Sequence, residues 1–267
     1  MRSRTVLADT QWRDLPWKSS QKGLRDLLID ILLEIPEVYH RTDELTRDNC
    51  RSKILPGLIN IMKLCWRIDS QLNEWYGLLE TFVAGPVYWP KLSTIDSPFD
   101  DTESGKVFAV AFHFPSYDVA HVMILYWIAL LLHHPLLCSM YEQLESLAGE
   151  GLEDMECTCI EVLIPETADI TVTVPSICPR HFTTEKLPPL GYRTEWASGA
   201  ARNICQSAEY VMQEKMGELG PTILLPRLIV VREFLAYASG DWTRELGWIA
   251  DQLSKIQDMG NDLSRYL

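Results

Sequence analysis

A chain of 267 residues, 47% of them hydrophobic, can bury a sizeable core within one large domain, which excludes disorder over most of its length. Its net charge of -13 disfavours sequence-independent binding to nucleic acid, because an acidic surface repels phosphate. No secretory signal is visible at the N-terminus, and seven scattered cysteines are more typical of a reducing compartment than of a disulfide framework.

Hydrophobic residues at helical spacing predict two helices in the first third of the chain. The first spans 24–35, and Pro36 bends or ends it because proline lacks an amide donor. The second runs from about residue 46 to 79, with a kink or break at Pro56-Gly57. Residues 87–90 then form an aromatic-rich connection.

The middle of the chain combines polar loops with one long apolar helix. Residues 91–106 are rich in Asp, Ser and Thr, which predicts a loop. A helix over 116–147, capped by Ser116, is apolar nearly all round up to Leu132 and should therefore lie at the centre of a bundle. Its longest apolar run is too short to span a bilayer comfortably, so a buried core helix is expected. Residues 149–190 mix strand-like Val and Thr with prolines, which predicts a long loop or insertion.

The helical pattern returns in the C-terminal third. Helices are expected over 194–216 and 221–239, with Pro226 delaying the start of the second by a turn. A last helix spans about 242–259 with Asp241 as its cap. The fold class is therefore all-α: an irregular multi-helix bundle with a long central apolar helix. Residues 1–267 are expected to form one helical domain, with loops at 91–106 and 149–190.

Two groups of polar residues could carry chemistry. His113 and His121 flank Asp118, which would suit a metal site or an acid–base pair, although ordinary core or helix-end histidines are the simpler interpretation. The residues Asp100, Asp101 and Glu103 form an acidic cluster that could hold Mg²⁺ if it lay on a helix. Because it lies in a predicted loop, a solvated acidic segment is expected instead.

The sequence contains no other recognisable catalytic or metal-binding motif. Cys157 and Cys159 have no second pair at zinc-ligand spacing, and Cys205 lies on an apolar helix face typical of a core. No phosphate-binding glycine loop, serine elbow or zinc-protease motif occurs. We therefore predict no catalytic residue, no cofactor-binding residue and no metal ligand. The arginines of the last third alternate with glutamates and should form a solvated, ion-pairing surface. They are Arg193, Arg202, Arg227, Arg232 and Arg244.

Several segments of the C-terminal third form an ordered set of motifs. Trp196 is followed by Ala-Arg-Asn-Ile-Cys-Gln-Ser-Ala-Glu-Tyr at 201–210, and then by Gly-Glu-Leu-Gly-Pro at 217–221. An Arg-Glu-x-x-Trp element occupies 244–248, and a tail that contains Ile256-Gln257 and Gly260 follows it. These segments resemble the regulatory region of fungal-specific zinc-cluster (Zn2Cys6) transcription factors.

The N-terminal two thirds agree with this family in the order of their motifs, so the resemblance covers nearly the whole chain. The matching segments are Trp12 with Pro16-Trp17, the helix up to Ile35-Pro36, Leu64-Cys65-Trp66 with Trp75, Gly85-Pro86-Val87-Tyr88-Trp89, and Phe114 through Tyr126-Trp127. The family's zinc cluster, with its closely spaced cysteines and basic flanks, has no counterpart. By this resemblance, Met1 corresponds to a position inside the family's regulatory region.

The resemblance implies a transcription regulator whose helical region gates activation and mediates association, with control of a secondary-metabolite pathway as its context. Its expected location is the nucleus, with the cytoplasm left open. Its expected partners are proteins of the transcription machinery or a homologous factor, and binding of a small-molecule effector is left open. We expect no association with a membrane and no direct contact with nucleic acid. Two alternatives remain. One is a helical enzyme or small-ligand-binding protein of a fungal biosynthetic pathway, with a pocket near His113 and His121. The other is a truncated gene product without independent activity.

Overall fold

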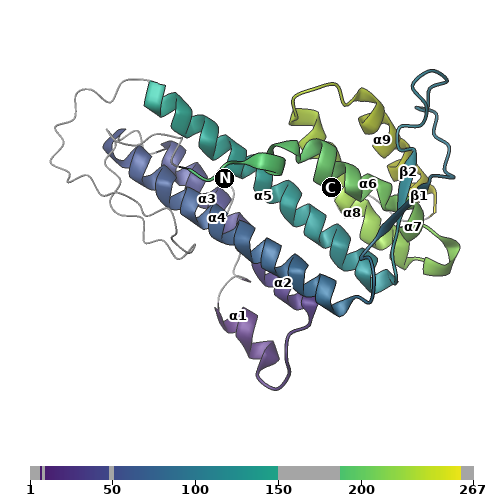
Figure 1. The fold of residues 1–267 in the computed structure, drawn as a ribbon, viewed down its shortest axis with the longest axis horizontal. Helices are drawn as coiled ribbons and strands as arrows, with labels where there is room; N and C mark the ends of the chain where they lie inside the picture. Colours follow the sequence, from purple (N-terminus) through teal and green to yellow (C-terminus); the bar gives the residue numbers. More distant parts are fainter. Residues whose placement is uncertain (1–6, 8–9, 48–50, 150–186, 260–267) are drawn as a thin grey trace.

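The described part of the molecule is all-α with one small antiparallel sheet, which confirms the predicted fold class (Figure 1). Most of the predicted 149–190 loop and the Cys157–Cys159 pair lie outside the described residues. The computed structural model describes residues 7, 10–47, 51–149 and 187–259.

The N-terminal segment folds into short helices, of which the last two pack against the two long helices of the molecule. After α1 (Thr10–Asp14) and the 3-10 turn η2 (Leu15–Trp17), α2 spans Leu24–Leu32 and α3 spans Ile35–Arg47. Pro36 occupies the first turn of α3, where a missing amide donor is tolerated. The prediction that a helix stops near Pro36 is thus correct, but the new helix that begins there was not predicted.

Two long antiparallel helices, α4 (Arg51–Phe82) and α5 (Tyr117–Gly149), lie side by side through the molecule (Figure 1). Helices α2 and α3 pack on this pair, and α6 and α8 pack on α5. The chain continues as helix through Pro56, and Gly57 leaves room for Leu45 of α3, to which an added Cβ would come within 2.5 Å. By length and composition α5 could cross a membrane, but 67% of its most apolar window is buried inside the protein, as in a core helix.

A β-hairpin connects α4 to α5, where only a connection and a loop were predicted. Strand β1 (Trp89–Leu92) pairs antiparallel with β2 (Val110–His113), with Trp89 opposite His113 and Leu92 opposite Val110. The predicted 91–106 loop is confirmed except for its first two residues, which belong to β1. Pro90 obscured this strand in the sequence, because proline cannot donate to a ladder.

The predicted helix over 194–216 is broken into short pieces. A π-turn places the amide of Ala201 3.1 Å from the carbonyl of Trp196, and the Ser207 hydroxyl donates to the carbonyl of Asn203 at 2.8 Å. Such hydroxyl bonds to the preceding turn bend helices, which explains the break at Ser207. The pieces are η5 (Gly191–Glu195), η6 (Ala197–Ala201), α6 (Arg202–Gln206), α7 (Ala208–Val211) and η7 (Glu214–Met216).

Two longer helices close the fold, α8 (Leu219–Tyr237) and α9 (Thr243–Asp258). Pro226 lies inside α8 and does not delay its start, so that prediction was wrong. Gly220 packs directly on α7, where an added Cβ would overlap the carbonyl oxygen of Val211. The Asp241 carboxylate accepts a hydrogen bond from the amide of Thr243 at 3.0 Å, but the N-cap residue of α9 is Trp242, so the predicted cap at Asp241 is displaced by one residue.

Candidate functional site

An aromatic cluster anchors the hairpin to the helices. The Tyr88 ring lies 4.7 Å from Phe112 and 5.4 Å from Trp127, measured between ring centroids. Phe114 packs edge-on against Tyr210 of α7 at 5.2 Å. We call Tyr88, Phe112, Phe114, Trp127 and Tyr210 the aromatic cluster. Its members come from segments far apart in the sequence, and all of them except Phe112 lie in motifs of the family resemblance.

The loop between the strands, residues 93–109, is fastened to α7 by Glu209. One carboxylate oxygen of Glu209 accepts the Ser93 hydroxyl at 2.8 Å and the other accepts the Thr94 hydroxyl at 2.6 Å. The amide of Thr94 also donates to this carboxylate. Burial alone would raise the pKa of Glu209, but these hydrogen bonds outweigh it and lower the pKa. The carboxylate therefore works as an ionised clamp.

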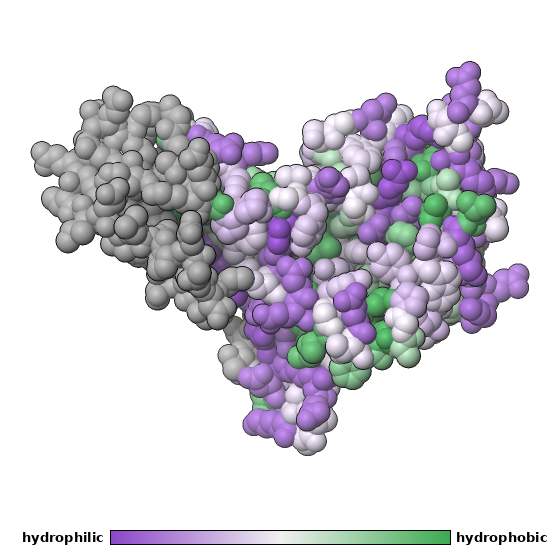
Figure 2. Space-filling view, in the orientation of Figure 1, coloured by the Kyte–Doolittle hydropathy of each residue, from purple (hydrophilic) through white to green (hydrophobic). Residues whose placement is uncertain are grey.

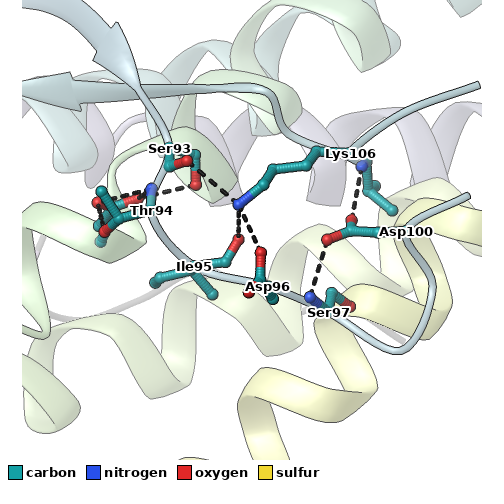
Figure 3. Close-up of polar contacts among 9 residues, drawn as sticks. Ser93, Thr94, Ile95, Asp96, Ser97, Asp100 and Lys106 are labelled. Carbon is teal, nitrogen blue, oxygen red and sulfur yellow. Dashed lines mark hydrogen bonds and ion pairs between the residues drawn. The ribbon is translucent and has the colours of Figure 1, made fainter. Parts of the chain in front are cut away.

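Lys106 holds the same loop from inside (Figure 3). Its Nζ donates to the main-chain carbonyls of Ser93 at 3.2 Å and Ile95 at 2.7 Å. It also pairs with the Asp96 carboxylate at 2.8 Å. The one ammonium group thus satisfies several acceptors and sets the curvature of the loop.

The acidic cluster proposed as a possible magnesium site serves the main chain instead. Asp100 accepts the amides of Ser97 and Val107, both at 2.9 Å (Figure 3). Asp101 accepts the amides of Glu103 and Ser104. In the described ranges, no group of three or more His, Cys, Asp or Glu side chains is arranged to hold a metal ion.

The Arg-Glu-x-x-Trp element of α9 completes the attachment of the loop. Arg244 donates to the carbonyl of Gly105 at 2.6 Å and to that of Phe99 at 3.3 Å. The Trp248 ring packs edge-on against Phe108 at 4.7 Å. Arg244 therefore binds main-chain carbonyls, so the predicted solvated ion-pairing surface is wrong for this residue.

A second candidate lies in the core between α4, α5 and η5. The guanidinium of Arg193 donates two hydrogen bonds to the Asp69 carboxylate, at 2.8 and 2.6 Å, and lies 4.7 Å from the centroid of Trp66. Burial would raise the pKa of Asp69, but the hydrogen bonds from Arg193 hold it well below its usual range. Arg193 is thus not part of a solvated surface, contrary to prediction. We call Asp69, His133, His134 and Arg193 the buried ion cluster.

The two histidines of this cluster are fully enclosed. His133 is 0% exposed, and neither ring nitrogen has a hydrogen-bond partner among the described residues. Burial lowers the pKa of His133 to about 3, so the ring is neutral at pH 7. His134 Nε2 lies 3.6 Å from an oxygen of Asp69, which is beyond hydrogen-bond range. Unpaired buried polar groups of this kind often mark functional positions.

The histidines singled out from the sequence do not come together. His113 of β2 lies against Trp89 and Tyr210, whereas His121 of α5 lies against Tyr117. Their neighbours differ, so no shared site forms between them. Cys205 is buried, as predicted.

Comparisons with protein-family models, curated proteins and solved structures find no match for this chain.

Proposed function

We propose that the chain is a transcription regulator of the zinc-cluster type that acts through its helical region. The supporting observation is that four of the segments carrying the family resemblance converge in space. The segments 85–89, 114–127, 201–210 and 244–248 are far apart in sequence, yet all meet at the hairpin and its 93–109 loop. A set of motifs that builds one structural unit is better support than the same motifs scattered over the molecule.

The charges favour action through protein partners. The net charge is -13, and hydrophilic and intermediate residues cover most of the described face, with hydrophobic residues in small separate groups (Figure 2). Several arginines are also occupied within the protein: Arg193 by Asp69, Arg202 by the carbonyl of Val107, and Arg244 by the loop. They are therefore not displayed as a stripe for phosphate. The proposed setting is the nucleus, where the chain associates with the transcription machinery or a homologous factor.

The test tethers the chain to a heterologous DNA-binding domain upstream of a reporter gene. We expect the tethered chain to change reporter output. Glu209→Ala, which releases the 93–109 loop from α7, should abolish most of this change. Glu214→Ala is the matched control, because Glu214 is an exposed carboxylate on the neighbouring turn. Absence of any reporter effect, together with turnover of a pathway intermediate by the purified protein, would overturn the proposal.

A second candidate is a helical enzyme or small-ligand-binding protein. The enclosed, unpaired ring nitrogens of His133 beside the Asp69–Arg193 pair favour it, because perturbed titratable groups concentrate at functional sites. Loss of both turnover and ligand binding in His133→Leu, with the reporter effect unchanged, would identify this candidate as the correct one.

A further inference from the structure

The segment 188–195, which contains η5, is bound to both α4 and α5 and buries none of its residues fully. Leu190 and Arg193 are half-buried, and the other residues of the segment are exposed. We call this segment the strap. A segment that buries little apolar surface opens locally at a small cost in free energy. We therefore expect the strap to open more readily than the two long helices beneath it.

The strap is fastened to both helices by polar contacts. The guanidinium of Arg193 donates to the Asp69 carboxylate of α4 through Nε at 2.8 Å and through a terminal nitrogen at 2.6 Å. From α5, the Tyr141 hydroxyl donates to the carbonyl of Pro188 at 2.6 Å, and the Cys138 thiol donates to that of Arg193 at 3.7 Å. Of these contacts, the Arg193–Asp69 pair alone joins two charges. Because Asp69 is buried, opening of the strap would leave its carboxylate without a counter-charge.

His134 of α5 faces the same carboxylate. Its Nε2 lies 3.6 Å from Oδ1 of Asp69, which is the oxygen to which Nε of Arg193 donates. The His134 side chain is 2% exposed, and this nitrogen has no hydrogen-bond partner among the described residues. A shift of about 0.6 Å would bring the two atoms into ordinary hydrogen-bond range. His134 is therefore placed to take over the carboxylate when Arg193 leaves.

The titratable and charged neighbours of His134 belong to α4, to the strap and to α5 itself. On α4, Asp69 stays ionised, because the hydrogen bonds from Arg193 outweigh the burial that would raise its pKa. The strap contributes Arg193 and also Tyr192, whose ring lies edge-on to that of His134 at 5.7 Å. On α5, the ring of His133 lies 5.9 Å away and is neutral, because burial lowers its pKa to about 3. Further groups that interact electrostatically with Asp69 are neutral at pH 7, because burial raises their pKa values; they are Cys65, Tyr126 and Tyr141. Loss of Arg193 would thus leave one uncompensated negative charge beside His134.

We propose that the strap is a proton-linked latch: when Arg193 leaves Asp69, His134 takes up a proton and replaces it as the partner of the carboxylate. The proton comes from water and adds to the imidazole ring, and no other covalent bond forms or breaks. The charge of the cluster stays balanced, because an imidazolium replaces the guanidinium. Since the open state binds one proton more than the closed state, a fall in pH favours opening. Opening also uncovers the face of Trp66, whose ring centroid lies 4.7 Å from the Arg193 guanidinium.

The test measures hydrogen–deuterium exchange of the strap amides in the purified full chain between about pH 8 and pH 6, the range in which imidazole gains a proton. Rates are corrected for the intrinsic pH dependence of amide exchange. We expect the equilibrium constant for strap opening to rise by up to about tenfold per pH unit as the pH falls, because opening takes up one proton. The amides of α5 report global unfolding and should stay protected throughout.

Three variants separate the parts of the latch. His134→Gln removes the titrating ring but keeps a polar side chain, so strap opening should lose its pH dependence. His133→Leu is the matched control, because it removes the adjacent buried ring and should leave the pH dependence of strap opening unchanged. Arg193→Met should increase strap opening by about tenfold or more at every pH, since it removes a charge-assisted bidentate contact.

A second measurement keeps the test decisive if His134→Gln does not fold. In Arg193→Met, NMR should show that the His134 ring keeps its proton to a higher pH than in the parent chain, because Asp69 has no other cationic partner there. Three outcomes overturn the proposal: strap opening that does not change with pH, a pH dependence that persists in His134→Gln, and a His134 ring that titrates identically with and without Arg193. The latch does not depend on the transcription role, so the exchange measurement can succeed where the reporter assay fails.

Discussion

The buried ion cluster and the 93–109 loop hold their charges in opposite ways. In the cluster, Asp69 and Arg193 depend on one another inside the core, away from water. In the loop, Lys106 and Asp100 bind mostly main-chain groups near the surface, and each contact is one of several. The difference implies that loss of one partner is severe in the core and mild in the loop, because an unpaired buried charge cannot turn to solvent.

The largest expected effect comes from breaking the buried pair. Arg193→Met leaves the Asp69 carboxylate buried without its partner, and the free energy of unfolding should fall by about 3 kcal/mol. The double variant Asp69→Leu with Arg193→Met removes both charges and should recover most of that loss. Urea denaturation of the two variants and the parent chain measures this.

The surface pair Arg232–Glu233 provides the control for the core pair. Arg232→Met should change stability by less than about 0.5 kcal/mol, as is usual for exposed ion pairs. If the double variant in the core is as unstable as Arg193→Met alone, the loss reflects packing of the side chains rather than the unpaired charge, and the comparison between core and loop fails.

The next effect is a pH dependence that His133 should confer. Its folded pKa of about 3 lies below the ordinary value of 6.5, so the unfolded chain binds more protons between these values. Stability should therefore fall as the pH drops below about 6.5, by up to about 1.4 kcal/mol per pH unit. Asp69 acts in the same direction only below its ordinary pKa near 4, since its folded pKa is lowered.

His133→Leu tests this, because leucine has a similar size and no titrating group. Between pH 6.5 and pH 4.5, approximately the window where Asp69 stays ionised, the variant should lose stability more slowly than the parent chain. His40→Leu, a substitution on α3 outside the buried ion cluster, is the control. An unchanged slope in His133→Leu would mean that His133 does not titrate as its burial requires.

The same contrast explains what could be predicted from the sequence. Helix α5 and its Ser116 cap, whose hydroxyl accepts the amide of Val119, follow from residues close together in the chain, and both were predicted. The Asp69–Arg193 pair joins residues that are 124 positions apart, and no local sequence pattern predicts such a contact. A polar residue within the hydrophobic stripe of α4 was the available signal, since Asp69 follows the buried Ile68 and precedes the buried Leu72. Because the site depends on contacts between residues far apart in the chain, it was much harder to predict from the sequence than the fold was.

A smaller effect is expected where the loop meets α7. Glu209→Gln keeps the shape of the side chain but removes the charge that strengthens its bonds to Ser93 and Thr94. The free energy of unfolding should fall by about 1 kcal/mol, and the Thr94 amide should exchange faster with solvent deuterium. The control Glu214→Gln changes an exposed carboxylate and should affect neither quantity. Slow exchange at Thr94 in Glu209→Gln would show that the loop is held by its other contacts.

The smallest effect should come from within the loop itself. Asp100→Asn leaves one oxygen to accept an amide, while the other position becomes a donor facing the amides of Ser97 or Val107. Because the loop retains the contacts of Lys106 and Arg244, the loss should be about 0.5 kcal/mol and confined to local exchange rates. Asp96→Asn, at a side chain that is 90% exposed, should change nothing measurable. A loss in Asp100→Asn as large as that in Arg193→Met would contradict the comparison, since it would mean that the loop depends on one carboxylate as completely as the core does.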